Sequence, residues 1–90
     1  MNEQKHPTLL EFPCAFPIKI MGAHHDDFAQ TVAEILSRHA PDFDPSTMEM
    51  RISEKGNYLS LTCTFTAESK QQLDALYQEL SDHPMVKIVL

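Results

Sequence analysis

Four neighbouring residues carry side chains that commonly bind metal ions: His24, His25, Asp26 and Asp27. They stand at the predicted start of a helix, where successive side chains diverge by about 100° around the axis and do not converge easily on one ion. Carboxylates at that point also suit the positive end of the helix dipole. We therefore expect no metal ion and no cofactor.

Nucleophilic chemistry would need a cysteine or hydroxyl beside a base. Cys63 lies on the apolar side of a predicted strand, where a thiol fills core space. Cys14 falls in a predicted loop with no histidine placed beside it. Ser60, Thr62 and Thr64 alternate along a strand, which is typical of good strand formers. We expect no catalytic residue and no enzymatic activity.

Three cations indicate a different chemistry, the binding of an anion. Lys19, Arg51 and Lys87 stand on the polar sides of three predicted strands, and Lys19 and Lys87 are expected to be neighbours. Thr62 and Thr64 lie on the polar side of a strand between them. We predict that this surface binds an anionic ligand or an acidic partner; the alternative is a plain solvated sheet face.

The chain as a whole is short and acidic. Its 90 residues hold seven Lys and Arg against thirteen Asp and Glu, a net charge of −6, and 42% of them are hydrophobic. The length fits one domain, and the apolar content excludes a disordered chain. The acidic balance argues against binding nucleic acid through bulk charge. Because the sequence shows neither a signal-peptide pattern nor an apolar run that could cross a bilayer, we expect a cytoplasmic protein with reduced cysteines.

Hydrophobic periodicity predicts six elements that position these residues. Alternation of apolar and polar residues indicates strands, and apolar spacings of three and four indicate helices. The predicted strands span residues 16–21, 47–53, 58–66 and 85–90, and the predicted helices span residues 25–39 and 67–81. Prolines exclude a helix before residue 16, so we divide the chain into an N-terminal extension, residues 1–15, and one domain, residues 16–90.

Each element also has a predicted apolar side. On the helices it consists of Phe28, Val32, Ile35, Leu36, Leu73, Leu76, Tyr77 and Leu80. On the strands it consists of Phe16, Ile18, Ile20, Met48, Met50, Ile52, Leu59, Leu61, Cys63, Phe65, Val86, Ile88 and Leu90. We expect these side chains to form one core, with Met85, Lys87 and Val89 facing out.

A Gly56-Asn57 pair predicts a hairpin between the second and third strands. A two-residue loop would pair Met50 with Cys63, and a four-residue loop would shift each partner by two residues. Both alternatives keep apolar residues opposite each other. A three-residue loop without a bulge is excluded because it would set Met50 opposite Thr62.

The order β-α-β-β-α-β with right-handed crossovers specifies an α+β fold, the ferredoxin-like βαββαβ sandwich. Its four-stranded antiparallel sheet has the order 4-1-3-2, with two helices on one face. Two functions found on this topology are excluded by the loop after the first strand, which begins with Gly22. Metal chaperones carry a CxxC motif there and acylphosphatases an arginine, whereas this chain has no CxxC and no arginine before Arg38.

The open sheet face would be positively charged in an otherwise acidic protein. Lys19, Arg51 and Lys87 against Glu49 give three positive charges and one negative, a net of +2. RNA-binding domains of this topology stack bases on aromatic residues of that face, and only Tyr58 could do so here. An RNA- or nucleotide-binding module is therefore the alternative function. A protein partner could also pair with an edge strand.

Several segments resemble the YbeD family of small bacterial proteins. They are LEFP at residues 10–13, KIMG at 19–22, HAP at 39–41, KGNY at 55–58, LY at 76–77 and VKIVL at 86–90. The resemblance covers roughly residues 9–90. It implies a ferredoxin-like fold similar to ACT regulatory domains, such as those of phosphoglycerate dehydrogenase, and no established enzymatic activity.

The resemblance also implies where such a module acts. ACT domains bind small ligands, often amino acids, at subunit interfaces beside a glycine loop after the first strand, and Gly22 occupies the matching place. Members lie near lipoate-biosynthesis genes, which implies a link to lipoate metabolism. We therefore expect a non-enzymatic regulatory or protein-interaction module of ACT-like type. Its expected partners are another protein or a second copy, with a small-molecule ligand as a further candidate and no membrane contact. The expected binding residues are Lys19, Gly22, Arg51, Thr62, Thr64 and Lys87.

Overall fold

The computed structural model describes residues 11–90, so most of the predicted N-terminal extension lies outside the described residues. The strands are β1 (Cys14–Ala23), β2 (Glu49–Ile52), β3 (Tyr58–Ala67) and β4 (Val86–Val89). The helices are α1 (Phe28–His39), the short 3₁₀ turn η2 (Pro45–Thr47) and α2 (Lys70–Asp82). The predicted element order is confirmed.

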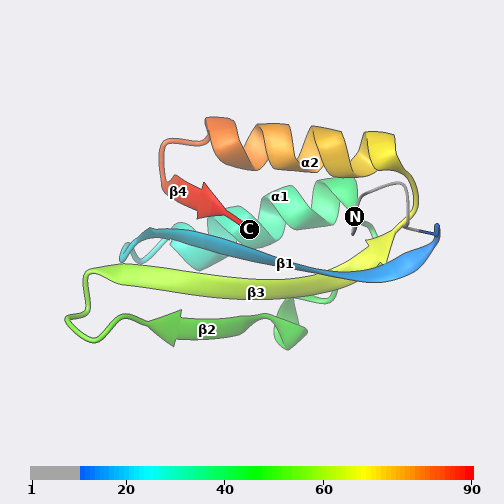
Figure 1. The fold of residues 1–90 in the computed structure, drawn as a ribbon. Coiled ribbons are helices and arrows are strands. Elements are labelled where there is room, and N and C mark those ends of the chain that lie inside the picture. Colours follow the sequence, from blue (N-terminus) through cyan, green and yellow to red (C-terminus); the bar gives the residue numbers. More distant parts are fainter. Residues whose placement is uncertain (1–10) are drawn as a thin grey trace, which may run out of the picture.

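The four strands form one antiparallel sheet in the order β2-β3-β1-β4, as predicted. Figure 1 shows the sheet with α1 and α2 packed along it and β2 at its lower edge. The buried side chains of the sheet and both helices form a single cluster, so the two helices share one core. The opposite face of the sheet is left open among the described residues.

The helices bury the faces that their periodicity predicted. Phe28, Val32, Ile35 and Leu36 are buried on α1, and Leu73, Leu76 and Leu80 on α2, with Tyr77 partly buried beside them. The Ser69 hydroxyl caps α2 by accepting a hydrogen bond from the Gln72 backbone N–H at 3.1 Å. This cap explains why α2 begins at Lys70 rather than at residue 67.

Helix α1 begins three residues later than expected. Asp27 is its N-cap residue, and its first turn holds no acidic side chain. Asp26 and Asp27 therefore precede the helix, and the expectation that they lie in the first turn is wrong. Arg38 and His39 are the basic residues of its last turn, where they suit the negative end of the helix dipole.

Strand β1 is longer than predicted and pairs with β3 over its whole length, from Cys14 opposite Ala67 to Ala23 opposite Tyr58. The expectation that Cys14 lies in a loop is wrong. The strand tolerates Pro17 because β4 pairs with β1 only between Lys19 and Gly22, so no partner requires the N–H that proline lacks.

The β2–β3 hairpin has the four-residue loop, one of the two predicted alternatives. Met50 pairs with Leu61 and Ile52 with Leu59. The loop closes with a 2.9 Å hydrogen bond from the Ser53 N–H to the Tyr58 carbonyl. Gly56 supplies the positive φ, 78°, that this turn requires.

Two residues expected in the core are exposed. Met50 and Ile52 share the helix side of the sheet with buried partners on β3, yet they are 55% and 52% exposed. β2 is the edge strand, and every one of its residues is exposed. The expectation that they are buried is wrong because alternation identifies a side of the sheet but not whether a helix covers it.

A bulge overturns the predicted faces of β4. Ile20 pairs with Val89 and Met21 with Ile88, but Gly22 pairs with Val86, so one extra residue, Lys87, is inserted. Because the pleat alternates, this insertion moves Ile88 to the open face and Val89 to the core side. Ile88 is 48% and Leu90 62% exposed. The expectations that Ile88 and Leu90 face the core are wrong, and so are those that Met85 and Val89 face out, since both pack partly buried against the core; Val86 is buried as predicted.

Replacement of Gly22 by alanine tests the closest packing in the fold. A Cβ at Gly22 would lie 2.6 Å from the Phe28 ring and would also meet the Met85 carbonyl oxygen. We expect the Gly22→Ala variant to lose about 2 kcal/mol of unfolding free energy in urea denaturation, because the strand and α1 must separate.

Gly56→Ala is the matched control. An added Cβ there has nothing within 4 Å, so the cost is the strain of a positive φ, about 1 kcal/mol. A smaller loss for Gly22→Ala than for Gly56→Ala would contradict the proposed packing constraint.

Candidate functional site: the open face of the sheet

Side chains on the open face are arranged in rows across the strands, because paired residues point to the same side. In one row, Lys19 of β1 lies opposite Thr62 of β3, which lies opposite Glu49 of β2. Leu90 flanks Lys19 on the other side through two backbone hydrogen bonds of 2.8 and 3.3 Å.

The next row is less charged. Ile88 of β4 lies opposite Met21 of β1, which pairs with Ser60 of β3, and Ser60 pairs with Arg51 of β2. Arg51 is therefore two residues along β2 from Glu49, in the row next to the one that contains Lys19. Together the two rows place two cations on a surface that also carries hydroxyl groups and aliphatic side chains.

A polar hollow of about 280 Å³ lies over the β2 side of this face. It is lined by Lys19, Glu49, Met50, Arg51, Ser60 and Thr62. Within residues 11–90 neither Lys19 nor Arg51 forms an ion pair; the ion pairs there involve Arg38, His39 and Lys70. The hollow can therefore offer two cations and two hydroxyls to an anion.

An apolar hollow of about 580 Å³ lies toward β4 and is lined by Met21, Tyr58, Lys87 and Ile88. A third hollow of about 280 Å³ shares Met21 and Tyr58 with it, and Arg51 and Ser60 with the polar hollow. The three hollows therefore adjoin. They combine a cationic region with an apolar one, which suits a ligand or peptide carrying both an anionic group and an apolar group.

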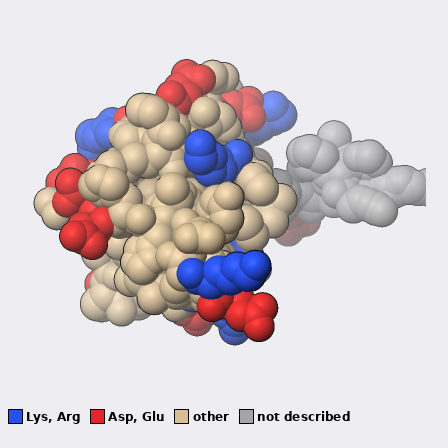
Figure 2. Space-filling model, turned by 90° about the vertical axis from the view of Figure 1, so that its left-hand side faces the viewer, with Lys and Arg blue, Asp and Glu red and all other residues tan. Residues whose placement is uncertain are grey.

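Charged side chains are distributed unevenly at the end of the molecule that holds the β2–β3 hairpin. Figure 2 views the end where the β2–β3 hairpin lies and shows mostly uncharged surface at the centre, with separate basic side chains on it. Acidic side chains lie mainly toward the rim of that view. The net charge of −6 is thus not spread evenly over the surface.

The structure brings together some of the predicted binding residues and separates others. Lys19, Arg51 and Thr62 line one hollow, and Lys87 lines another. Thr64 is exposed on the same face, opposite Pro17, but lines none of these hollows. Lys19 and Lys87 are not neighbours, because the residue beside Lys19 on β4 is Leu90; that expectation is wrong.

Gly22 lies away from the open face. It is buried within β1, pairs with Val86 and approaches the Phe28 ring, so it is a packing position on the helix side. The sequence analysis did not predict Ile88 as a surface residue, because no residue near Lys87 indicates the bulge. Met21 could have been found, since it alternates with the buried Ile20.

The His24 and His25 side chains both contact the backbone. The His24 Nδ1 donates to the Gly56 carbonyl at 2.8 Å, and the His24 N–H donates to the Asn57 carbonyl at 2.8 Å. The Nδ1 of His25 accepts from the Asp27 N–H at 3.0 Å. The two bonds of His24 hold the loop after β1 against the hairpin, whereas the bond of His25 lies within the loop. In the part of the chain that the structure describes, no group of three or more His, Cys, Asp or Glu is arranged to hold a metal ion.

The two cysteines are free thiols in different surroundings. Cys63 is fully buried in the core, and burial raises its pKa to about 12. Because the thiolate is the nucleophile, this thiol is inert at neutral pH, as predicted from its place on the strand. Cys14 is partly buried at the start of β1.

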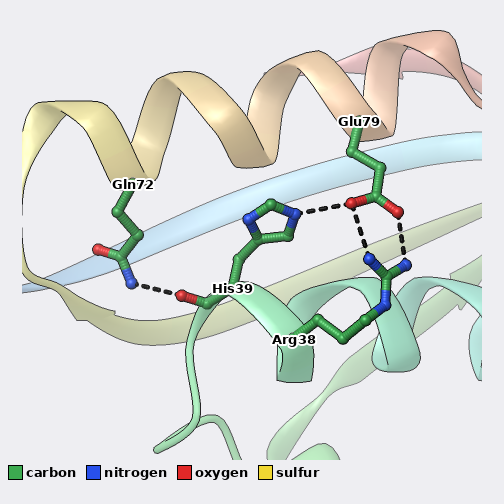
Figure 3. A network of polar contacts seen from close by, with 4 residues as sticks. All are labelled: Arg38, His39, Gln72 and Glu79. Atoms are coloured by element: carbon green, nitrogen blue, oxygen red, sulfur yellow. Dashed lines mark hydrogen bonds and ion pairs between the residues drawn. The ribbon is translucent and has the colours of Figure 1, made fainter.

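A polar network joins the two helices on the other side of the sheet (Figure 3). Arg38 donates two hydrogen bonds to the Glu79 carboxylate, one of them at 3.0 Å, and the His39 Nε2 donates to the same carboxylate at 2.7 Å. The Gln72 amide donates to the His39 carbonyl at 2.8 Å. The hydrogen bonds from Arg38 and then from His39 lower the pKa of Glu79 to about 2. The network sets the position of α1 against α2.

The element order and the sheet topology place the protein in the class of small α+β domains with a ferredoxin-like fold. Its fold resembles the solution structure of protein HP0495 from H. pylori, with a TM-score of 0.74 and 18% identity over 98% of this chain and 91% of that one. It also resembles the ACT domain from GTP pyrophosphokinase of Chlorobium tepidum, with a TM-score of 0.65 and 14% identity over 87% of this chain and 96% of that one. Identities this low show the fold alone.

The sequence shows the family. Residues 7–90 match the family described as "Protein of unknown function (DUF493)", and the chain belongs to it. The UPF0250 protein NE1487 of Nitrosomonas europaea is 57% identical over 83 residues, 92% of this chain and 95% of that protein. A UPF0250 protein of Chromobacterium violaceum is 49% identical over the full length of both. The expected membership in a family of small bacterial proteins with an ACT-like fold is confirmed.

No helix within residues 11–90 is long and apolar enough to span a bilayer.

The lowered pKa of the Glu79 carboxylate predicts how the free energy of unfolding depends on pH. Its folded pKa of about 2 lies below the ordinary value of 4.5. Its contribution is therefore complete above pH 4.5 and is lost as the pH falls toward 2. We expect Glu79→Gln to lower the unfolding free energy at pH 7, because it removes the charge that Arg38 and His39 bind. The loss should be only about 1 kcal/mol, since water screens the partly exposed carboxylate. The difference from the wild type should shrink in acid.

Urea unfolding of both proteins between pH 2 and 7 measures this difference. Asp74→Asn is the control, because the Lys70–Asp74 pair is two-thirds exposed and should contribute little. A constant difference at all pH values, or an equal effect of Asp74→Asn, would exclude the Glu79 network as its source.

Proposed function

We propose that this protein is a non-enzymatic regulatory or interaction module of ACT-like type. On the open face of its sheet it binds an anionic small molecule or an acidic segment of a partner protein. The observation that carries the proposal is the set of adjoining hollows over that face, lined by Lys19, Arg51 and Lys87 in a chain of net charge −6. Within residues 11–90 none of these cations forms an ion pair.

The state of the reactive side chains supports a non-enzymatic role. Cys63 is buried with a raised pKa, and His24 and His25 are engaged by nearby backbone groups. The hydroxyls of Ser60 and Thr62 share the polar hollow with Lys19, Arg51 and the Glu49 carboxylate, and no histidine or cysteine lines that hollow. The chemistry of the face is therefore that of binding.

The combination of cationic and apolar hollows favours a particular kind of ligand. Lys87 lines the same hollow as Met21, Tyr58 and Ile88. A ligand whose anionic group is bound by Lys87 would therefore place its aliphatic or aromatic part against these apolar side chains. Amino acids and lipoyl compounds both meet this description. The resemblance to ACT domains implies amino acids as ligands, and the resemblance to the YbeD family implies a link to lipoate metabolism. Regulation within lipoate metabolism is the pathway we propose.

An RNA or nucleotide ligand is the second candidate, and it depends on Tyr58. This ring is 55% exposed and lines the hollow that also contains Lys87. RNA-binding sheets of this topology combine several aromatic residues with cations on the two central strands. The other open-face residues of those strands, such as Lys19, Ser60 and Thr62, cannot stack bases.

Charge reversal on the open face tests the proposed binding surface. Lys19→Glu combined with Lys87→Glu replaces two lining cations, and we expect it to weaken binding of an anionic probe at least tenfold. Amide chemical shifts measure this during titration with a hexaglutamate peptide, glutamate, lipoate and an octauridine RNA. The matched control is Lys55→Glu combined with Lys70→Glu, which changes the net charge equally and lines none of the hollows.

The outcomes separate the candidates. Shifts of open-face amides with peptide, glutamate or lipoate, lost only in the Lys19/Lys87 variant, support the proposal. Salt-dependent shifts with RNA alone, lost on Tyr58→Ala, support the second candidate. If no probe shifts open-face amides, or if both double variants bind equally, the open face is not the binding surface.

A further inference from the structure

The polar hollow over the β2 side of the open face holds one carboxylate beside its two cations. Glu49, Lys19 and Arg51 all line this hollow, together with the hydroxyl groups of Ser60 and Thr62. Arg51 stands two residues from Glu49 on β2, and Lys19 and Glu49 both lie opposite Thr62. Two positive charges and one negative charge therefore surround the same space, so the lining carries a net charge of +1.

The three charged side chains of the hollow do not neutralise one another. Within residues 11–90 no ion pair joins Glu49 to Lys19 or to Arg51, and the ion pairs there involve other residues. Lys19 of β1 and Glu49 of β2 are paired with the same residue of β3, so two strand spacings separate their Cα atoms by about 10 Å. All three residues are exposed. The Glu49 carboxylate is therefore an unneutralised charge at the wall of the hollow.

The net charge of the lining limits how much negative charge the hollow can neutralise. A single carboxylate brings −1 and balances the lining. A phosphate monoester brings about −2 above pH 7, so its second charge would stay uncompensated beside Glu49. Like charges placed side by side at a binding surface repel, and an uncompensated charge that leaves water is costly. Lys87 does not supply the missing positive charge, because it lines the apolar hollow toward β4 instead.

We propose that Glu49 determines the specificity of the open face, by admitting a carboxylate to the polar hollow and rejecting a phosphate monoester. The inference rests on the proposed function, because it concerns the same surface. It narrows the ligand class from anions in general to carboxylates. A partner's carboxylate side chain and a free carboxylic acid share this chemistry, and the hexaglutamate and glutamate titrations described above separate the two.

Replacement of Glu49 by glutamine removes the negative charge and keeps the size of the side chain. Because Coulomb energy is proportional to the charge of the ligand, the gain in affinity for a dianion should be about the square of the gain for a monoanion. For charges this exposed we expect about threefold tighter binding of a carboxylate and about tenfold tighter binding of a phosphate monoester.

Butyrate and propyl phosphate measure this discrimination, because they join the same propyl group to a carboxylate and to a phosphate monoester. Amide chemical shifts of open-face residues give both dissociation constants at constant ionic strength and at about pH 8, where the phosphate carries both charges. The wild type should bind butyrate about threefold more tightly than propyl phosphate, and Glu49→Gln should abolish that preference.

Two further variants separate charge in the hollow from other effects of the substitution. Glu49→Asp keeps the charge and should keep the preference for butyrate. Glu68→Gln changes the net charge of the protein as Glu49→Gln does, but this residue lines none of the three hollows and should leave both constants unchanged. Amide spectra of each variant show that it is folded.

The possible results distinguish failure of this inference from failure of the proposed function. A butyrate preference that Glu49→Asp keeps and Glu49→Gln loses supports the inference. If both probes bind the open face but Glu49→Gln changes their affinities by the same factor, or if the wild type prefers propyl phosphate, the inference is wrong and the proposed function stands. If neither probe shifts open-face amides in the wild type or in Glu49→Gln, both are wrong.

Discussion

Both helices and both edge strands of this protein pack against or pair with the β1–β3 ladder. Its ten residue pairs run the length of both central strands. On one side it presents buried residues such as Ile18, Ile20 and Leu61, against which both helices pack. On the other side the same pairing sets Lys19 beside Thr62 and Met21 beside Ser60. Because neighbouring residues of a strand face opposite ways, the core and the candidate binding face are positioned by the same backbone hydrogen bonds.

The two edges of the sheet give the open face its character. At the β4 edge, the bulge at Lys87 turns Ile88 toward the open face and produces the apolar hollow with Met21. At the β2 edge, regular pairing leaves Arg51 on the open face and Met50 uncovered on the helix side. One edge thus adds an apolar surface to the open face, and the other adds a cation to it.

Alternation and helical spacing predicted the fold because each element carries its own apolar side. The buried positions of α1, from Phe28 to Leu36, follow directly from their spacing. The same logic placed Lys19, Arg51 and Thr62 on one face, and the structure brings them to one hollow. It failed at Ile88, where one inserted residue exchanges the two faces of the strand. It also failed at Met50, where the apolar side extends beyond the helices.

Sequence patterns alone predicted the order of elements, the sheet topology, the buried faces of the helices and the sign of the charge on the open face. These properties are local, or follow from the handedness of short connections. The three-dimensional structure was needed to establish the length of the β1–β3 ladder, the four-residue hairpin loop, the bulge in β4 and the exposure of β2. Each of these depends on which distant segment lies alongside a strand and how far it reaches, and no pattern within the strand itself encodes that contact.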